Sequence, residues 1–189
     1  MIIRPAKSTE KADHHLYVIS DEKELDKLEL SKEEKTYVSA SLSKKGDKII
    51  RLNRYPKFIY IVRVSIAKTK EHQLLETTRI SGNKLLRMLK AEDPSKIMIE
   101  SLSYKLSAGA FAEGMALGAY QFLKYYSDGA KKRIKLSEIC ISGLDKIEGQ
   151  ELSAIVKGVY KARDLVNEPL SFLTANQLAQ EAKKAGDES

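Results

Sequence analysis

The chain has 189 residues, a length that suits one large domain or one domain with a short extension. Hydrophobic residues make up 42% and charged residues 31%, with 10 glycines and 4 prolines, so the composition excludes fibrous and low-complexity chains. The net charge of +7 is concentrated ahead of Ala162, because the residues from there onward are more acidic than basic. Such a balance can attract nucleic acid or anionic ligands, but solvated lysines are its commoner cause.

Neither a membrane span nor a secretory signal is expected. The longest weakly polar run, 108–120, is interrupted by Glu113 and falls short of the roughly 20 apolar residues that a span needs. The N-terminal sequence MIIRPAKSTEKADHH lacks the apolar core of a signal peptide, and the single Cys140 excludes an internal disulfide. These features predict a cytoplasmic protein.

Short strands and short helices are predicted in the first third of the chain. Asp21 is expected to cap one helix, and Ser31 with Glu34 forms a capping box at the start of the next. A hairpin that turns at Tyr55-Pro56 follows; its second strand is almost continuously apolar and is expected centrally in the sheet. In chain order, the predictions are strands at 1–5 and 15–20, helices at 21–28 and 31–43, and hairpin strands at 48–53 and 57–66.

From residue 57 onward, strands and helices alternate. A long helix is predicted from 69 or 70 to about 90, with Leu74, Thr78, Leu85 and Leu89 on one face and Gly82 at a close crossing or a bend. The next predictions are a strand at 96–102, a helix at 107–126, a strand at 133–142 and a helix at 146–166. Because each parallel crossover needs a helix-length connection, this order predicts an α/β fold: a three-layer α/β/α sandwich with a mixed, mostly parallel sheet.

The predicted helix SAGAFAEGMALGAYQFLKYY is rich in small residues. Gly114 and Gly118 lie four positions apart, and Ala110 lies one step earlier. Small residues at this spacing let backbones approach closely; in a membrane they would favour helix dimerisation, but this run is too short and too polar to span one. We therefore predict that Gly114 and Gly118 are helix-packing residues, and that this helix packs closely on the sheet.

Catalytic and metal-binding constellations are not recognisable in the sequence, so no catalytic and no metal residues are predicted. His14 and His15 point to opposite faces of a strand, His72 lacks a second histidine one turn away, and Cys140 lies in an apolar strand. Phosphate-binding glycine loops and a G-x-S-x-G elbow are absent. The basic run KKRIK (131–135) lacks interleaved aromatic residues, which favours a solvated loop over a nucleic-acid site.

Two segments carry a family resemblance. The sequence GVYKARDLVNEPLSFLTANQLAQEAKKAG resembles the junction of cytosol (leucyl) aminopeptidases, in which the helix joining two domains ends in A-R-D-L-V-N-x-P. Upstream, FAEGMALGAYQFLKYYSD resembles the small-residue helix of the same family. The inter-domain junction positions in this chain are Arg163, Asp164, Leu165, Asn167 and Pro169.

The resemblance implies a macrodomain-like N-terminal domain at 1–145, an inter-domain linker helix at 146–168, and the truncated start of a C-terminal catalytic domain at 169–189. The family's catalytic domain binds two divalent metal ions, zinc or manganese, and contains an N-T-D-A-E-G-R motif that does not occur in these residues. The implied parent is a metallopeptidase that removes N-terminal residues from peptides by two-metal hydrolysis. This chain is therefore expected to bind no cofactor and to be inactive by itself.

The same resemblance implies the partners and the role of the domain. Expected partners are its own catalytic domain and the other subunits of a homo-hexamer, and expected roles are domain packing, oligomer assembly or control of active-site access. An alternative is a module that binds anionic ligands or nucleic acid on a macrodomain-like scaffold. An independent enzyme is disfavoured, because the sequence shows no acid–base pair or nucleophile at a recognised catalytic spacing.

A last helix is expected after Thr174, which caps it. Leu178 and Ala182, with Phe172 before them, would form an apolar stripe on this helix. We expect residues 175–189 to be mobile or to pack on a neighbouring molecule, and weak protection of these amides from hydrogen exchange would support that expectation.

Overall fold

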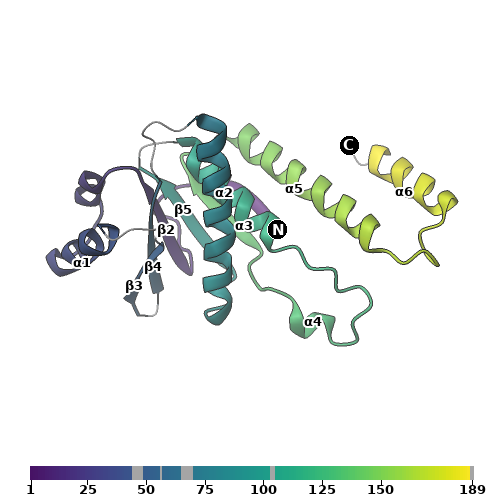
Figure 1. The fold of residues 1–189 in the computed structure, drawn as a ribbon, viewed down its shortest axis with the longest axis horizontal. Coiled ribbons are helices and arrows are strands. Elements are labelled where there is room, and N and C mark those ends of the chain that lie inside the picture. Colours follow the sequence, from purple (N-terminus) through teal and green to yellow (C-terminus); the bar gives the residue numbers. More distant parts are fainter. Residues whose placement is uncertain (44–48, 56, 65–69, 103–104, 188–189) are drawn as a thin grey trace.

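Six strands form one mixed sheet (Figure 1). The computed structural model describes residues 1–43, 49–55, 57–64, 70–102 and 105–187. The strand order is β1-β6-β5-β2-β4-β3, and every neighbouring pair is parallel except β3 and β4, which form the predicted hairpin. The strands are β1 Ile2–Ala6, β2 His14–Ile19, β3 Ile49–Arg54, β4 Lys57–Arg63, β5 Lys96–Ser101 and β6 Glu138–Ser142.

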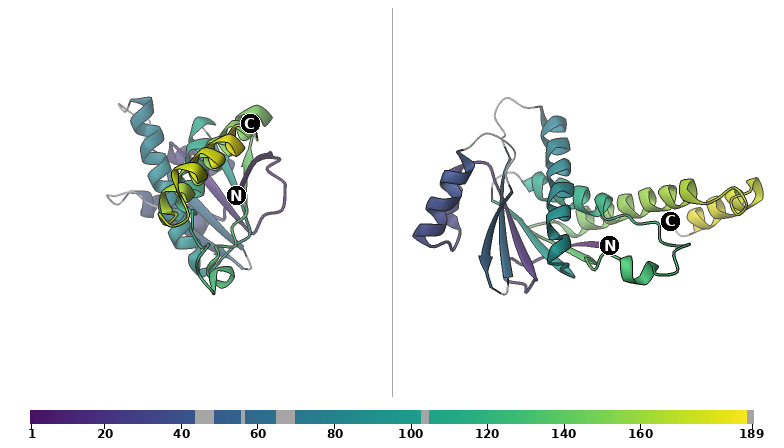
Figure 2. Two further views of the ribbon diagram at one scale, coloured as in Figure 1. Left: turned by 90° about the vertical axis from the view of Figure 1, so that its right-hand side faces the viewer. Right: turned by 60° about the horizontal axis from the view of Figure 1, so that its bottom comes forward.

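Helices cover both faces of the sheet, which confirms the predicted three layers (Figures 1 and 2). One face packs against η1 and α1, and the other packs against α2, α3 and α5. The α5 helix extends well beyond the sheet, and α6 folds back beside its far end (Figure 2). The helices are η1 Glu22–Lys27, α1 Lys32–Leu42, α2 Glu71–Met88, η2 Leu89–Ala91, α3 Lys105–Gly118, α4 Gly129–Lys132, α5 Lys146–Asn167 and α6 Ala175–Asp187.

The apolar run of β4 is buried on both faces of the sheet. Tyr60 and Val62 belong to the core under α2 and α3, whereas Ile61 belongs to the core under α1. The expected central position is nevertheless wrong, because β4 lies between β2 and the edge strand β3, and the middle of the sheet is formed by β5 and β2. A strand next to an edge still has both faces covered when helices pack on both sides.

Local sequence signals set the starts of the first two helices as predicted. The Asp21 side chain accepts a hydrogen bond from the Lys23 N–H at 3.0 Å. At the next helix, the Ser31 hydroxyl accepts from the Glu34 N–H at 3.2 Å, and the Glu34 carboxylate accepts from the Ser31 N–H at 2.8 Å. These bonds satisfy backbone donors that a helix start otherwise leaves unpaired. Pro56 and residues 65–66 of the predicted hairpin lie outside the described residues.

Glycines bring α2 and α3 into backbone contact. A Cβ built on Gly114 would collide with the Arg79 backbone, and one built on Gly82 would collide with the Phe111 backbone. A Cβ on Gly118 would collide with the side chain of Asn83. The sheet packing expected for the glycine face of α3 is therefore wrong, because that face meets another helix. The prediction of a close crossing at Gly82 is confirmed.

Two predicted elements are shorter in the structure. The helix predicted at 107–126 ends at Gly118, and residues 119–128 continue as irregular chain up to α4. The strand predicted at 133–142 begins only at Glu138, because β1 and β5 pair with β6 from that residue onward. Part of the basic run, Lys131 and Lys132, lies in α4 instead of a loop tip.

The candidate junction site

The α5 helix is anchored to the sheet by its first half and carries the junction residues on its second half. Asp145 caps its start through the Ile147 N–H at 2.7 Å, and Val156 is buried in the main core. The Ser153 hydroxyl donates to the Ile3 carbonyl of β1 at 2.9 Å. These contacts fix the direction in which the second half of α5 leaves the sheet.

Side chains of α5 cap the C-terminal end of α3. The Tyr160 hydroxyl donates to the Ala116 carbonyl, and the Arg163 guanidinium donates to the Leu117 carbonyl at 2.7 Å. The last carbonyls of a helix have no partner within the helix and carry its partial negative charge, so a cation placed there is stabilising. Burial raises the pKa of Tyr160 to about 12, which keeps its hydroxyl proton in place as a donor. This capping explains why α3 ends before the predicted residue.

Tyr120, two residues after the end of α3, contacts three of the predicted junction residues. Its hydroxyl donates to Asp164 Oδ1 at 2.8 Å and accepts from Asn167 Nδ2 at 3.1 Å. The Arg163 guanidinium carbon lies 5.4 Å from the centre of the Tyr120 ring, a cation–π geometry. Burial, followed by the hydrogen bond to Asp164, raises the pKa of Tyr120. The motif residues of α5 thus hold the chain that follows α3.

Glu168 forms a second contact between this segment and the end of α5. Its carboxylate accepts hydrogen bonds from Lys124 Nζ at 2.6 Å and from the Tyr125 hydroxyl, and its side chain is only 7% exposed. The hydrogen bond from Lys124 is the main cause that lowers the pKa of Glu168. Lys124 Nζ also lies 3.8 Å from the centre of the Phe172 ring. Lys124 therefore holds the turn that follows α5 at two points, Glu168 and Phe172.

The remaining junction residues lead into α6. Leu165 is half-buried, and the Pro169 carbonyl accepts from the Phe172 N–H at 2.9 Å. The Thr174 hydroxyl accepts from the Gln177 N–H at 3.3 Å, as expected for a cap. Within α6, all of which the structure describes, no residue is buried, and Leu178 is 46% exposed. The mobility predicted for 175–189 stays a prediction, and residues 188–189 lie outside the described part.

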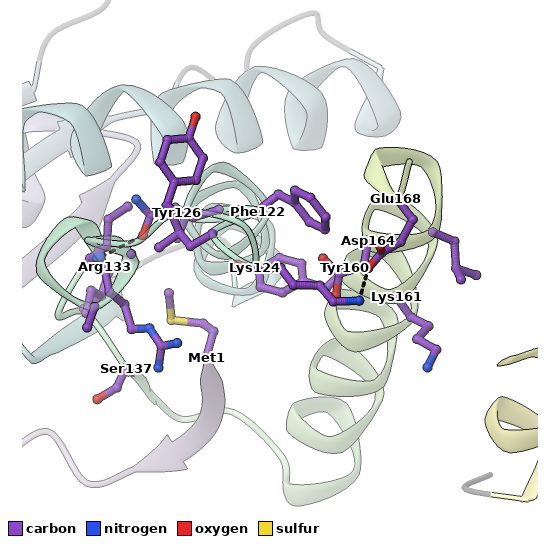
Figure 3. A pocket seen from close by; sticks show the side chains of 18 of the residues that line it. Met1, Phe122, Lys124, Tyr126, Arg133, Ser137, Tyr160, Lys161, Asp164 and Glu168 are labelled. Atoms are coloured by element: carbon purple, nitrogen blue, oxygen red, sulfur yellow. Dashed lines mark hydrogen bonds and ion pairs between the residues drawn. The ribbon is translucent and has the colours of Figure 1, made fainter. Parts of the chain in front are cut away.

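A groove of about 850 Å³ lies between the segment after α3 and the second half of α5. Figure 3 shows Met1, Arg133 and Ser137 on one side of it, and Tyr160, Asp164 and Glu168 on the other, with the Lys124–Glu168 contact between them. We call these surroundings the junction groove. Within the groove, Lys124 pairs with Glu168, Lys161 pairs with Glu181, and Asp164 accepts from the Tyr120 hydroxyl. These side-chain contacts tie α5 to its neighbouring segments, an arrangement suited to fixing their relative position.

Sequence reasoning found the motif residues on α5 but missed their partners. Tyr120, Lys124 and Tyr160 were not singled out, although Tyr120 and Lys124 lie inside the quoted small-residue segment. A usable signal was available: three polar residues of one motif, Arg163, Asp164 and Asn167, occupy one side of a helix and need partners. Nothing in the local pattern indicated which segment supplies them.

The histidines and the cysteine do not converge on one metal-binding or catalytic site. His14 and His15 lie on opposite faces of β2, His72 is exposed on α2, and burial raises the pKa of the inert Cys140 thiol. Among the described residues, no group of three or more His, Cys, Asp or Glu side chains is placed to hold a metal ion. The part of the chain that the structure describes also holds no helix that is long and apolar enough to cross a membrane.

Acidification is expected to release α6 from α5. Hydrogen bonds from Lys161 and Lys184 lower the pKa of Glu181 to about 2. A carboxylate with a lowered folded-state pKa contributes stability above its unfolded value of about 4.5, and that contribution is lost as the pH falls toward about 2. Amide exchange in α6 should therefore accelerate relative to α5 between pH 5 and 2.5. In Glu181→Gln, exchange in α6 should already be fast at pH 5; an unchanged profile would contradict the assignment.

Solved structures with a similar fold are leucine aminopeptidases and a related enzyme. A tomato leucine aminopeptidase variant superimposes with a TM-score of 0.73 at 20% identity, covering 100% of this chain and 42% of its own. The bottromycin maturation enzyme BotP in complex with Mn superimposes with a TM-score of 0.65 at 18% identity, covering 92% of this chain and 36% of its own. The fold is that of the N-terminal domain of leucine aminopeptidases.

Curated relatives identify the family more closely. A probable cytosol aminopeptidase of Aquifex aeolicus is 32% identical over 147 residues, which cover 75% of this chain and 29% of the relative. That of Clostridium tetani is 27% identical over 192 residues, which cover 97% of this chain and 36% of the relative. No protein-family model matches the chain. The chain belongs to the cytosol aminopeptidase family, and it spans little more than a third of these relatives at most.

Proposed function

We propose that this chain is the non-catalytic N-terminal domain of a leucyl aminopeptidase that removes N-terminal residues from peptides. The observation that carries the proposal is the sequence match to cytosol aminopeptidases, of which this chain covers only a part. On this proposal residues 1–145 form the domain, 146–168 the linker helix, and 169–189 the start of the catalytic domain. The domain acts in the cytoplasm, where it takes part in domain packing, assembly of a homo-hexamer or access to the active sites.

The junction geometry supports a linking role for α5. The helix is anchored to β1 at one end, and at the other its polar motif side chains hold the segment after α3. A linker of this kind holds whatever follows it in a fixed position relative to the sheet, because its second half cannot swing without breaking hydrogen bonds to Leu117 and Tyr120. The exposed apolar side chains after it, Leu170 and Leu178, offer contact area to the domain that we propose to follow.

Two-metal peptide hydrolysis needs carboxylates that bridge both ions, and the described residues do not fit such a centre. One structural neighbour is, by its title, a complex with Mn. We therefore propose that the two divalent ions of the parent enzyme, zinc or manganese, are bound by its catalytic domain and not by this one. No catalytic step is assigned to residues of this chain.

Peptidase activity provides the test of this proposal. The chain should hydrolyse a leucyl chromogenic amide no faster than a protein-free blank, with manganese or zinc added, because the residues that the structure describes hold no metal-binding carboxylate set. An intact cytosol aminopeptidase assayed in parallel serves as the positive control. Turnover at the rate of that control would sink the proposal. The reading frame beyond Ser189 should also encode an N-T-D-A-E-G-R motif.

The alternative, a nucleic-acid or anion-binding module, receives less support at the basic run. Lys132 pairs with Asp128 at 3.0 Å, and Lys135 pairs with Asp93 at 2.9 Å. Neutralised lysines contribute little to counterion release on nucleic acid. We therefore keep the aminopeptidase domain as the proposed function.

A further inference from the structure

The junction groove opens onto the edge of the main core. Ala119 and Leu136 line the groove and are almost completely buried, and Met1, Ile134 and Tyr160, which also line it, pack against the same core. The groove volume of about 850 Å³ lies in the range of pockets that hold small ligands, and such pockets are mostly apolar with a few polar groups. The groove is therefore large enough and apolar enough to accept a side chain of another molecule.

Two phenylalanines that line the groove are only partly covered. Phe122 is half-buried, and its ring centre lies 5.7 Å from that of Tyr125. Phe172 is 41% exposed, with Lys124 Nζ 3.8 Å from the centre of its ring. Aromatic rings bury a large area when they are covered, so both phenylalanines would gain contact with an apolar group that enters the groove.

Arg133 is a lining cation that has no partner in the described part of the chain. On the α5 side, Lys124 pairs with Glu168 at 2.6 Å and Lys161 pairs with Glu181 at 2.7 Å. Arg133 is exposed and takes part in no hydrogen bond or ion pair with any residue that the structure describes. A guanidinium presents a planar fork of donors that matches the two oxygens of a carboxylate. The groove therefore offers one uncommitted group that is suited to a carboxylate.

The backbone on both sides of Arg133 is held by Gln121. Gln121 Nε2 donates to the Lys132 carbonyl at 2.9 Å, and Gln121 Oε1 accepts from the Ile134 N–H at 2.8 Å. The Arg133 side chain lies on the same side of the groove as Ser137 (Figure 3). Because the backbone is already fixed, less conformational freedom is lost when Arg133 binds a ligand.

The charges and hydroxyls of the groove favour a peptide. Asp164 lies on the side opposite Arg133 (Figure 3), and its hydrogen bond from the Tyr120 hydroxyl leaves its negative charge in place. A carboxylate is therefore attracted toward Arg133 and repelled from α5. Ser127 and Ser137 also line the groove, and their hydroxyls can bond to amide groups, which a peptide has and an alkyl chain lacks.

We propose that the junction groove binds the C-terminal end of a short peptide, with its carboxylate at Arg133 and a large apolar last side chain against Phe122 and Ile134. The apolar side chain contributes buried area, and the carboxylate sets the orientation of the peptide. This binding does not rest on the proposed peptidase role, because it needs neither a metal ion nor hydrolysis. Since α5 forms one side of the groove, the bound peptide bridges α5 and the segment after α3.

Titration of the isotope-labelled chain, followed by amide NMR shifts, tests the proposal. N-acetyl-alanyl-leucine is the probe, and it should saturate the shifts of residues 122–123 and 133–137 with a Kd of about 1 mM or tighter at low salt. N-acetyl-alanyl-leucinamide lacks the carboxylate and N-acetyl-alanyl-glycine lacks the apolar side chain, so each should bind about tenfold more weakly or worse. Octanoate, which has a carboxylate but no amide, should also bind more weakly than the probe.

Two variants each remove one contact with the peptide. Arg133→Ala should weaken binding about tenfold, and Phe122→Ala about fivefold. Lys131→Ala is the matched control, because Lys131 is exposed, lies two positions away and does not line the groove; it should bind the probe as the wild type does. Thermal unfolding of each variant shows whether it is folded at the temperature of the titration.

Four results would overturn the proposal. They are no saturation up to about 20 mM probe, equal binding of the leucinamide, tighter binding of octanoate at the same amides, and equal effects of Arg133→Ala and Lys131→Ala. The last result would mean that the net charge, and not the placement of Arg133, attracts the peptide.

Discussion

Gly114→Ala is expected to destabilise the domain by about 3 kcal/mol, at the upper end of the range for overpacked cores. The added methyl group would collide with the backbone of Arg79. Backbone cannot rotate away as a flexible side chain can, so α2 and α3 would have to separate along their whole contact. The midpoint of thermal unfolding should fall by about 9 °C, given roughly 3 °C per kcal/mol for a domain of this size.

Gly158→Ala is the matched control for that change. Gly158 lies inside α5, and a Cβ built there meets nothing within 4 Å. Since alanine favours the helix over glycine, this substitution should stabilise the protein by about 1 kcal/mol. Equal effects of the two substitutions, measured by urea or thermal unfolding, would show that helix propensity and not the α2–α3 crossing governs Gly114.

Arg163→Ala should cost about 2 kcal/mol, which is typical for a hydrogen bond to a charged group. The substitution leaves the Leu117 carbonyl without its donor and removes the cation from the Tyr120 ring. Unfolding in urea should show the lower stability, and amide exchange should quicken in the second half of α5 and in residues 117–125. The sheet amides should keep their relative order of protection.

Lys157→Ala on the same helix separates this effect from a general loss of positive charge. Lys157 is exposed, and the substitution should change the free energy of unfolding by less than about 0.5 kcal/mol. Arg163→Lys is informative as well, because lysine keeps the charge but lacks the planar donor geometry of arginine. If Arg163→Ala lowered the free energy of unfolding no more than Lys157→Ala, the capping of α3 by α5 would not contribute to stability.

Elements governed by local patterns could be predicted from the sequence. The cap at Asp21, the capping box at Ser31 and the apolar face of α2 depend on residues within one or two turns, so the sequence alone reveals them. The alternation of strands and helices likewise predicted a mostly parallel sheet. The junction on α5 was indicated by the resemblance of its sequence to the A-R-D-L-V-N-x-P segment of cytosol aminopeptidases.

Features set by distant partners could not be predicted in this way. The sequence predicts a helix that continues to residue 126, yet α3 stops at Gly118, where α5 supplies donors to its last carbonyls. The glycine face of α3 was expected on the sheet, since spacing shows only that some backbone comes close and not which one.

The pairing of β1 with β6 has a consequence for how the chain acquires its structure. Ile2 lies beside Glu138, so the first strand can pair with its neighbour β6 only after almost the entire domain has been made. Closing so long a loop is entropically costly, and contacts of this kind slow folding. During synthesis the N-terminal strand must wait, while the β3–β4 hairpin can form from neighbouring residues at once. We expect β1 to dock last, and the anchor of α5 on Ile3 to be completed only in that final step.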